Sequence, residues 1–224
     1  MRIEAVIFDM DGLMLDSERY YAEASKKAVA AMGFEPSDDL IRRTVGGSHD
    51  NWLRCYREHY GPDFSEEQFR VFCDKEMSYW YQNGIPTKPG LFELLDYLDE
   101  QGIPRAVASS TQEAKATQAL EKAGVYHRLH QHIFGDQIPL GRGKPNPDIF
   151  LEAARRLGVD PAGCMGLEDS INGLRASFAA GLYTVMIPDS IEPNPQLLAH
   201  THHCLPTLAH VIPLLEELNT PVTA

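Results

Sequence analysis

The sequence predicts an α/β fold, in which a parallel sheet forms the core and a block of four helices is inserted near the start. Residues 5–8 are four apolar residues in a row, bounded by a polar turn that contains glycine. This pattern is typical of a short strand buried on both faces of a parallel sheet. Residues 86–224 alternate strand and helix patterns, which indicates a parallel sheet with right-handed crossovers. Residues 16–85 show helix patterns throughout, so we expect an inserted helical bundle.

The helical block begins after the first strand, and turn residues separate its helices. Asp16 or Ser17 can cap the first helix, and Gly33 is a suitable residue to end it. Ser65 opens the fourth helix with a sequence close to a capping box. The four helices are expected at residues 16–32, 37–45, 49–59 and 65–82.

The remaining segments supply the core. Residues 90–101 carry leucines at helical spacing and predict an amphipathic helix. Further strands are expected at residues 105–108, 133–134, 164–167 and 183–187, the last of which is the final clear strand. Further helices are expected at residues 112–124, 146–157, 172–180 and 208–218. We assign residues 1–15 and 86–224 to an α/β core domain and residues 16–85 to a helical domain.

Composition limits the class of protein and of partner. The chain has 224 residues, of which 43% are hydrophobic and 23% charged, as in ordinary globular proteins. It has no run of about 18 apolar residues that could span a membrane, and its first residues do not resemble a signal peptide. The net charge of −12 disfavours nucleic acid as a partner. A site that handles phosphate would therefore need its own local positive potential.

Cysteine and histidine usage favours a reduced cytoplasmic protein, for which we expect a monomer by default. The four cysteines lack metal-ligand spacing, and no secretory signal supports disulfides. His200, His202 and His203 could bind zinc, but no cysteine or acidic partner lies at ligand spacing. We therefore expect an exposed polar loop at these histidines.

Polar side chains follow several of the predicted strands. Asp9 and Asp11 come directly after residues 5–8, and Gly12 lets the chain leave the strand with unusual dihedral angles. Ligands of open α/β sheets bind outside the carboxyl ends of the strands, so polar groups at these ends would meet at one site. The candidate site residues are Asp9, Asp11, Ser109, Ser110, Lys144, Glu168 and Asp169.

Each of these groups, taken alone, has a simpler structural explanation. An Asp-x-Asp-Gly sequence after a strand often makes only a turn. Residues 109–111 can cap a helix as well as cradle a phosphate. Lys144 can be a surface lysine, although Gly and Pro on both sides place it in a defined loop. The carboxylates at 168–169 can favour a helix N-terminus or supply oxygen ligands for Mg²⁺.

Together, the groups resemble the four motifs of the haloacid dehalogenase superfamily of phosphohydrolases. Residues 9–18 are similar to the first motif, and Ser109 matches the second. Lys144 matches the third motif within Gly-Lys-Pro-x-Pro-Asp, and residues 166–173 match the fourth. The helical block at 16–85 falls where the family's small cap is inserted. Within the family, the sequence is most similar to the β-phosphoglucomutase-like phosphatases.

The resemblance implies a Rossmann-like core with a helical cap and a Mg²⁺-dependent phosphatase of small phosphorylated metabolites. It implies that Asp9 is the nucleophile that forms an aspartyl-phosphate and that Asp11 is the general acid and base. It further implies that Lys144, Ser109 and the Ser110 N–H hold the phosphoryl group. The implied metal ligands are the Asp9 carboxylate, the Asp11 backbone carbonyl and Asp169, with Glu168 helping directly or through water.

Substrate specificity is expected in the cap loop around Gly47 and His49 and at Trp52. These side chains also have simpler explanations, since His49 can be the first exposed residue of its helix and Trp52 can belong to the core. Sugar phosphates, nucleoside monophosphates and short-chain phosphates all remain open as substrates.

The alternative to a phosphatase is a phosphosugar mutase on the same scaffold. The β-phosphoglucomutases carry an Arg in the cap loop and a His just after the first motif. The matching positions here hold His49 and Tyr21, which favours the phosphatase, although Arg42 or Arg43 could supply the missing cation. A non-catalytic binding domain is least favoured, because every motif position is filled.

Overall fold

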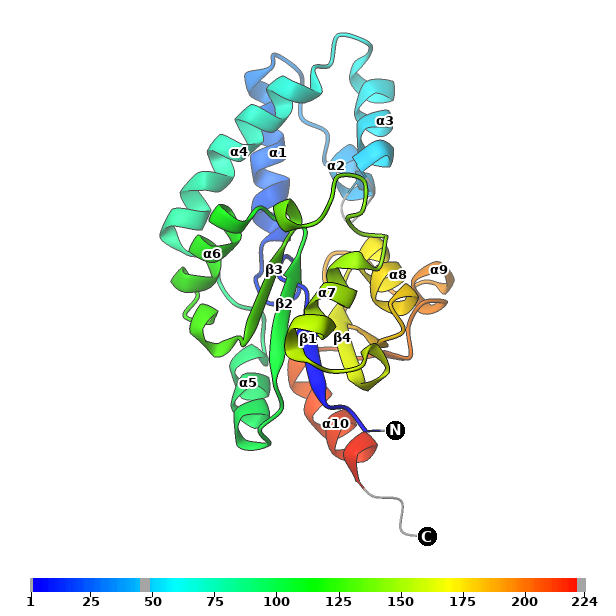
Figure 1. Ribbon diagram of the computed structural model, residues 1–224. Helices are drawn as coiled ribbons and strands as arrows, with labels where there is room; N and C mark the ends of the chain where they lie inside the picture. Colours follow the sequence, from blue (N-terminus) through cyan, green and yellow to red (C-terminus); the bar gives the residue numbers. More distant parts are fainter. Residues whose placement is uncertain (1, 45–48, 221–224) are drawn as a thin grey trace.

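The structure, a computed structural model, describes residues 2–44 and 49–220, except for the side chains of residues 42–43 and 49–53. A central sheet lies between layers of helices, and further helices stand beyond one edge of the sheet (Figure 1). At the opposite edge, Ile3 N–H donates a hydrogen bond to Asn219 Oδ1 (2.7 Å). The amide of Asn219 donates in return to the Ile3 carbonyl (3.2 Å).

Among the described residues, six parallel strands form one sheet in the order β3-β2-β1-β4-β5-β6. They are β1 (Ala5–Phe8), β2 (Arg105–Ser109), β3 (Gln131–Phe134), β4 (Cys164–Glu168), β5 (Tyr183–Met186) and β6 (His203–Cys204). Strand β1 is central, and its Ile7 is in register with Ala106 of β2 and Gly166 of β4. The chain adds β2 and β3 on one side of β1 and then returns to add β4 on the other. Ligands bind at such a switch point.

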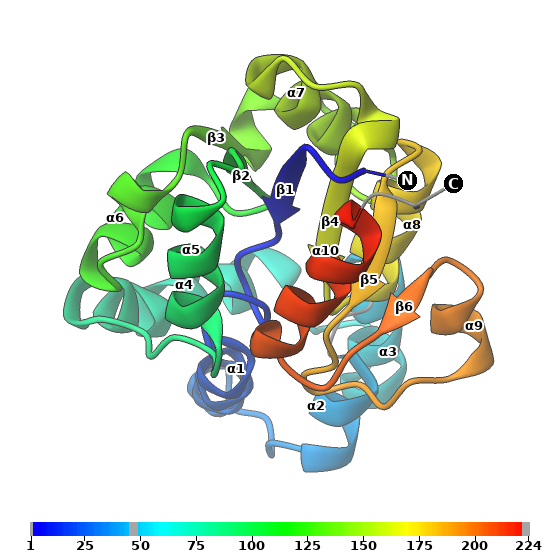
Figure 2. The ribbon, with the colours of Figure 1, turned by 90° about the horizontal axis from the view of Figure 1, so that it is seen from below.

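Helices cover both faces of the sheet. One face carries α5 (Leu91–Glu100), α6 (Glu113–Lys122) and α10 (Val211–Asn219), and the other carries α7 (Asp148–Leu157) and α8 (Ile171–Ala179). Side chains of β1 alternate between the two cores: Val6 and Phe8 pack on the first, and Ala5 and Ile7 on the second. A view from below places β1 between α7 and α10 (Figure 2). The α/β fold class predicted from the sequence is confirmed.

The described part of residues 16–85 is helical, as expected. It contains α1 (Glu18–Ala31), α2 (Asp38–Thr44), α3 (His49–Tyr60) and α4 (Glu66–Asn83). The helices share an apolar cluster in which the ring of Tyr56 contacts Phe64 and Phe69. Helix α4 also packs on α6, where Lys115 Nζ pairs with Asp74 Oδ1 (2.9 Å). The exact division into two domains stays a prediction.

The C-terminal part of the core differs from the expectation. A short helix, α9 (Pro195–Leu198), and the edge strand β6 follow β5, so residues 183–187 do not form the last strand. The loop expected at the histidines is confirmed for His200 and His202, which lie outside helices and strands, but His203 begins β6. His202 accepts a hydrogen bond from Thr184 N–H at Nδ1 (3.0 Å), and its ring stacks on Tyr183. These contacts give His202 a structural role at the sheet edge.

Two further features concern composition. None of the helices in the described part of the chain is long and apolar enough to cross a membrane. All four cysteines are free thiols: Cys55, Cys73, Cys164 and Cys204.

Candidate active site

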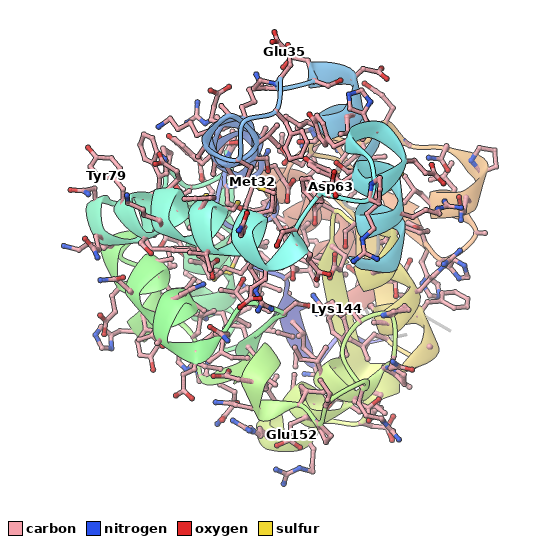
Figure 3. All side chains as sticks on the ribbon, turned by 90° about the horizontal axis from the view of Figure 1, so that it is seen from above. Met32, Glu35, Asp63, Tyr79, Lys144 and Glu152 are labelled. Atoms are coloured by element: carbon pink, nitrogen blue, oxygen red, sulfur yellow. The ribbon has the colours of Figure 1, made fainter. Side chains whose placement is uncertain are left out.

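The candidate residues from four strand ends converge on a cavity of about 190 Å³. Its lining residues follow the carboxyl ends of the strands, and the helices α1 to α4 stand beyond this edge of the sheet (Figure 1). From above, Lys144 lies near the middle of the molecule, beside β1 (Figure 3). The described lining consists of Asp9, Asp11, Glu18, Ser110, Lys144, Asp169, Ser170 and Asn172.

Lys144 connects the two central strands of the site. Its Nζ donates hydrogen bonds to Asp9 Oδ1 (2.5 Å) and to Glu168 Oε1 (2.6 Å), and its side chain is 6% exposed. It also lies over the ring of Phe150. Burial alone would lower the pKa of Lys144, but the two carboxylates raise it above the ordinary value. The lysine is therefore a fixed positive charge next to Asp9.

Glu168 is held on both of its oxygens. While Oε1 accepts from Lys144, Oε2 accepts from Asp169 N–H (3.1 Å), Ser170 N–H (3.3 Å) and the Ser170 hydroxyl (3.1 Å). Helix α8 can approach this carboxylate because residue 173 is glycine; a Cβ there would lie 1.8 Å from the Glu168 carboxyl carbon. Glu168 therefore positions Lys144 and the start of α8.

The carboxylate of Asp169 is buried and lies close to those of Asp9 and Glu168. Its Oδ2 would lie 2.3 Å from a Cβ at Gly12, whose φ of +80° already requires glycine. Burial raises the pKa of Asp169 well above its ordinary value, and the charges of Glu168 and Asp9 raise it further. Burial also raises the pKa of Asp9, although Lys144 opposes this shift.

The donor set of this cluster fits a magnesium ion. Oxygen atoms of Asp9, Glu168 and Asp169 lie within 4.8 Å of one another, and all three side chains are buried. Mg²⁺ prefers carboxylate oxygen ligands, and buried like charges are costly unless a cation neutralises them. The cluster can therefore hold a metal ion, whose identity stays a prediction.

Asp11 is oriented by a residue that the motif analysis did not assign. The hydroxyl of Thr111 donates to Asp11 Oδ2 (2.7 Å), whereas Oδ1 is buried and has no hydrogen-bond partner among the described residues. Burial raises the pKa of Asp11, and the Thr111 hydrogen bond lowers it. Ser17, expected to cap helix α1, makes no side-chain cap bond; its hydroxyl accepts from Gly12 N–H (3.1 Å) instead.

The remaining predicted residues divide into two groups. Ser109 is buried at the end of β2, where its hydroxyl accepts from Thr111 N–H (3.0 Å), and Ser110 lines the cavity. Gly47 lies outside the described residues. His49 begins α3, but its side chain lies outside the described part as well.

Glu18 lines the cavity, although the motif analysis did not single it out. Burial raises its pKa to about 7, and the charges of Asp11 and Asp189 contribute. Asp189 forms an ion pair with Lys88, and the charge of Lys88 lowers the pKa of Glu18. Glu18, Lys88 and Asp189 thus form a second group of charges next to the cavity.

A larger cavity, of about 840 Å³, lies at the opposite edge of the sheet. Its described lining includes Arg2, Tyr97 and Asn219, and the acidic cluster of the described residues lies elsewhere. We assign the candidate active site to the smaller cavity, because the carboxylates and Lys144 converge there.

Comparisons with known proteins agree with this assignment. A model of the haloacid dehalogenase-like hydrolases matches residues 3–181. A phosphorylated carbohydrates phosphatase of Thermotoga maritima is 32% identical over 80% of this chain and 82% of its own. A protein of Drosophila melanogaster, named as a probable pseudouridine-5′-phosphatase, is 30% identical over 98% of this chain and 95% of its own.

A solved structure has the same fold. It comes from Thermotoga maritima, is provisionally assigned as a β-phosphoglucomutase, and superposes with a TM-score of 0.78 at 29% identity. The match covers 96% of this chain and 100% of the other. The predicted enzyme class, a phosphoric monoester hydrolase, is confirmed by the family match and by the curated relatives. The chain therefore belongs to the haloacid dehalogenase-like hydrolases.

Proposed function

We propose that this protein is a Mg²⁺-dependent phosphatase that hydrolyses small phosphorylated metabolites through an aspartyl-phosphate on Asp9. The observation that carries the proposal is the placement of Asp9. Its carboxylate lies between the ammonium of Lys144 and a buried group of carboxylates, at the switch point of the sheet. A nucleophile in phosphoryl transfer needs this combination of positioning and charge neutralisation.

In the first step, an Asp9 oxygen attacks phosphorus and the bond from phosphorus to the leaving oxygen breaks. Asp11 gives its proton to that leaving oxygen, which departs as an alcohol. Lys144, Ser109 and the Ser110 N–H hold the phosphoryl oxygens. In the second step, Asp11 removes a proton from water, the water oxygen attacks phosphorus, and Asp9 is released as the free carboxylate.

The acidic cluster would hold Mg²⁺ through the Asp9 carboxylate, the Asp11 backbone carbonyl and Asp169. The ion would supply neutralisation of the charge on the phosphoryl oxygens. Glu168 would support the ion from behind, since Lys144 and Ser170 already occupy its oxygens. Lys144 lies beside Asp9 and would bind the phosphoryl oxygens through its ammonium group.

The substrate would be a small polar phosphate monoester. The cavity is small. Two relatives of the protein are named for phosphorylated carbohydrates and for pseudouridine 5′-phosphate. A nucleic acid is disfavoured by the net charge of −12. The mutase alternative has support from the name of the structural relative, and both activities use the same nucleophile. A monomeric state remains our expectation.

Two assays test the proposal. Purified protein should release phosphate from p-nitrophenyl phosphate with Mg²⁺ and lose this activity in EDTA; equal rates in EDTA would contradict the metal role. A screen of phosphorylated metabolites then identifies the substrate. Product analysis with β-glucose 1-phosphate and a trace of glucose 1,6-bisphosphate separates the two functions. Phosphate release supports the phosphatase, and formation of glucose 6-phosphate without phosphate release supports the mutase.

A further inference from the structure

The loop that leads to Lys144 has little packing of its own. Residues 139–143 are exposed, and the side chain of Leu140 projects fully into solvent. No described atom lies within 4 Å of the place where a Cβ would stand at Gly141 or Gly143, and glycine has more backbone freedom than any other residue. Apolar contacts therefore do not fix the backbone of this loop, and hydrogen bonds have to do so.

Asn146 supplies three of these hydrogen bonds. Its Nδ2 donates to the carbonyls of Gly141 (3.1 Å) and Gly143 (3.0 Å), and its backbone N–H also donates to the Gly143 carbonyl (3.0 Å). An asparagine amide has two N–H donors, so each of them can serve one carbonyl. Pro145 and Pro147 lack a backbone N–H, and the Asn146 side chain provides the donors that this segment would otherwise be short of.

The ammonium group of Lys144 has a narrowly defined place. Its Nζ donates to Asp9 Oδ1 (2.5 Å) and Glu168 Oε1 (2.6 Å) and lies 5.0 Å from the centre of the Phe150 ring. A lysine side chain is a flexible stem with many rotamers, so its ammonium is well placed only when its backbone is held. A misplacement of about 1 Å in a catalytic site can cost about 10²-fold in rate. The loop backbone is therefore part of what the site requires.

We propose that Asn146 is a positioning residue, which holds the loop at 141–146 so that the Lys144 ammonium meets the phosphoryl oxygens. Asn146 is exposed and is not part of the described cavity lining, so it acts through Lys144 and not on the substrate. The motif Gly-Lys-Pro-x-Pro-Asp leaves this position open, which is why the motif analysis did not single it out. This inference rests on the proposed function, since it assigns Lys144 the role of holding the phosphoryl group.

Two substitutions and one matched control test the inference. Asn146→Ala removes both side-chain donors without adding a charge, and Asn146→Ser keeps one donor. The control is Asn83→Ala, because Asn83 is also an exposed asparagine whose Nδ2 donates to a local carbonyl, that of Tyr79 (2.7 Å). Circular dichroism checks the fold of each variant.

The first measurement is the turnover of p-nitrophenyl phosphate with Mg²⁺. Asn146→Ala should lower kcat about tenfold, the factor expected from the loss of one or two ordinary hydrogen bonds. Asn146→Ser should lie between Asn146→Ala and the wild type, and Asn83→Ala should match the wild type. In a Lys144→Ala background, Asn146→Ala should cause no further loss, because residues that act as a unit are not additive. An equal loss in both backgrounds would show that Asn146 does not act through Lys144.

The second measurement needs no turnover. Protein in EDTA is treated with acetic anhydride, and mass spectrometry quantifies acetylation at each lysine. The Lys144 side chain is 6% exposed and should react slowly in the wild type. Asn146→Ala should raise its rate about tenfold, because the loop opens more often when its hydrogen bonds are lost. Lys115 on α6 should react equally in both proteins, and an unchanged rate at Lys144 would overturn the inference.

The outcomes separate the inference from the proposed function. If the wild-type protein cleaves phosphate monoesters but Asn146→Ala changes neither kcat nor the acetylation of Lys144, the positioning role is wrong and the phosphatase stands. If the wild-type protein with Mg²⁺ cleaves neither p-nitrophenyl phosphate nor any member of the metabolite panel, the proposed function is overturned. The role of Asn146 in catalysis then falls with it, whatever the acetylation result.

Discussion

Two charged clusters occupy opposite edges of the same sheet, and their charge balance differs. At the amino edge, Arg105 is buried and pairs with Asp99, while its Nε donates to the Arg128 carbonyl (2.6 Å). Arg128 pairs with Asp99 (2.5 Å) and with Asp96 (2.8 Å). Two guanidinium groups thus meet two carboxylates. At the carboxyl edge, Lys144 lies among four carboxylates of the described residues, namely Asp9, Asp11, Glu168 and Asp169.

The pKa values of the carboxylates differ between the two clusters in the way that their charge balance predicts. The hydrogen bond from Arg105 lowers the pKa of Asp99, so this cluster stabilises its own charges. Burial raises the pKa of Asp9 and of Asp169, so the other cluster is costly until a cation joins it. A cluster with balanced charges stabilises its own ion pairs, whereas an unbalanced buried cluster indicates a binding site.

The largest expected effect comes from removing the nucleophile. Asp9→Asn keeps the shape of the side chain but loses the negative charge and the nucleophilic oxygen. We expect kcat for p-nitrophenyl phosphate to fall by about 10⁴-fold or more, as when a member of a catalytic unit is removed. Circular dichroism checks the fold. A variant that folds and keeps about a tenth of the wild-type rate would contradict the assignment of Asp9.

The second largest effect is expected at Asp169 and Glu168, the two adjacent carboxylates of the cluster around Lys144. Asp169→Asn should raise the Mg²⁺ concentration needed for half-maximal activity by about 10²-fold, the upper range for a weakened metal site. Glu168→Gln should raise it less, because Glu168 already bonds to Lys144 and Ser170. Activity titrations with Mg²⁺ measure both changes.

Thermal stability provides an independent test of whether Asp169 is a metal ligand. In EDTA, Asp169→Asn should unfold at a higher temperature than the wild type, because it removes one of several buried like charges. Mg²⁺ should stabilise the wild type strongly, through binding to the folded state, and the variant weakly. If Mg²⁺ shifts the unfolding temperature of both proteins equally, Asp169 is not a ligand.

Motif spacing was sufficient to predict the fold class and to predict which side chains lie together at the candidate site. The strand ends that carry Asp9, Ser109 and Asp169 meet at one edge because parallel strands share a direction. The sequence alone therefore predicts that these side chains lie together. The same holds for Lys144, whose loop is fixed by flanking glycine and proline.

Hydrogen-bond partners were harder to predict. Thr111 adjoins Ser109 and Ser110 in the sequence, but its bond to Asp11 depends on the turn after β2. Ser17 has the residue type and position of a helix cap, yet Gly12 N–H competes for its hydroxyl. Strand β6 has two residues, which is too short for a periodic pattern.

The pH dependence of stability should differ with and without metal. The folded protein has raised pKa values at Asp9, at Asp169 and, at about 7, at Glu18. The folded state therefore binds more protons than the unfolded state between about pH 4.5 and 7, and stability falls as pH rises through this window. In EDTA, the wild type should unfold at a higher temperature at about pH 5.5 than at about pH 7.5.

Saturating Mg²⁺ should reverse this order, because protons compete with the metal for the same carboxylates. Asp169→Asn should reduce the slope in EDTA, since it removes one of the groups with a raised pKa. Thermal unfolding curves across this range provide the measurement. A wild-type protein whose stability in EDTA rises with pH would show that the cluster is not repulsive.

The smallest effect is expected at the balanced cluster. Asp99→Asn removes a partner of Arg105, but the Asp99 side chain is 49% exposed, so water can replace much of the lost pairing. The free energy of unfolding should fall by no more than about 1 kcal/mol, while kcat/KM and the Mg²⁺ requirement stay unchanged. In the double variant with Asp169→Asn, the two changes in stability should add, because distant sites without shared partners are independent. A coupling of more than about 0.5 kcal/mol would mean that the sheet transmits charge or strain between its edges. The two clusters would then not be independent, which contradicts their separate roles in stability and in binding.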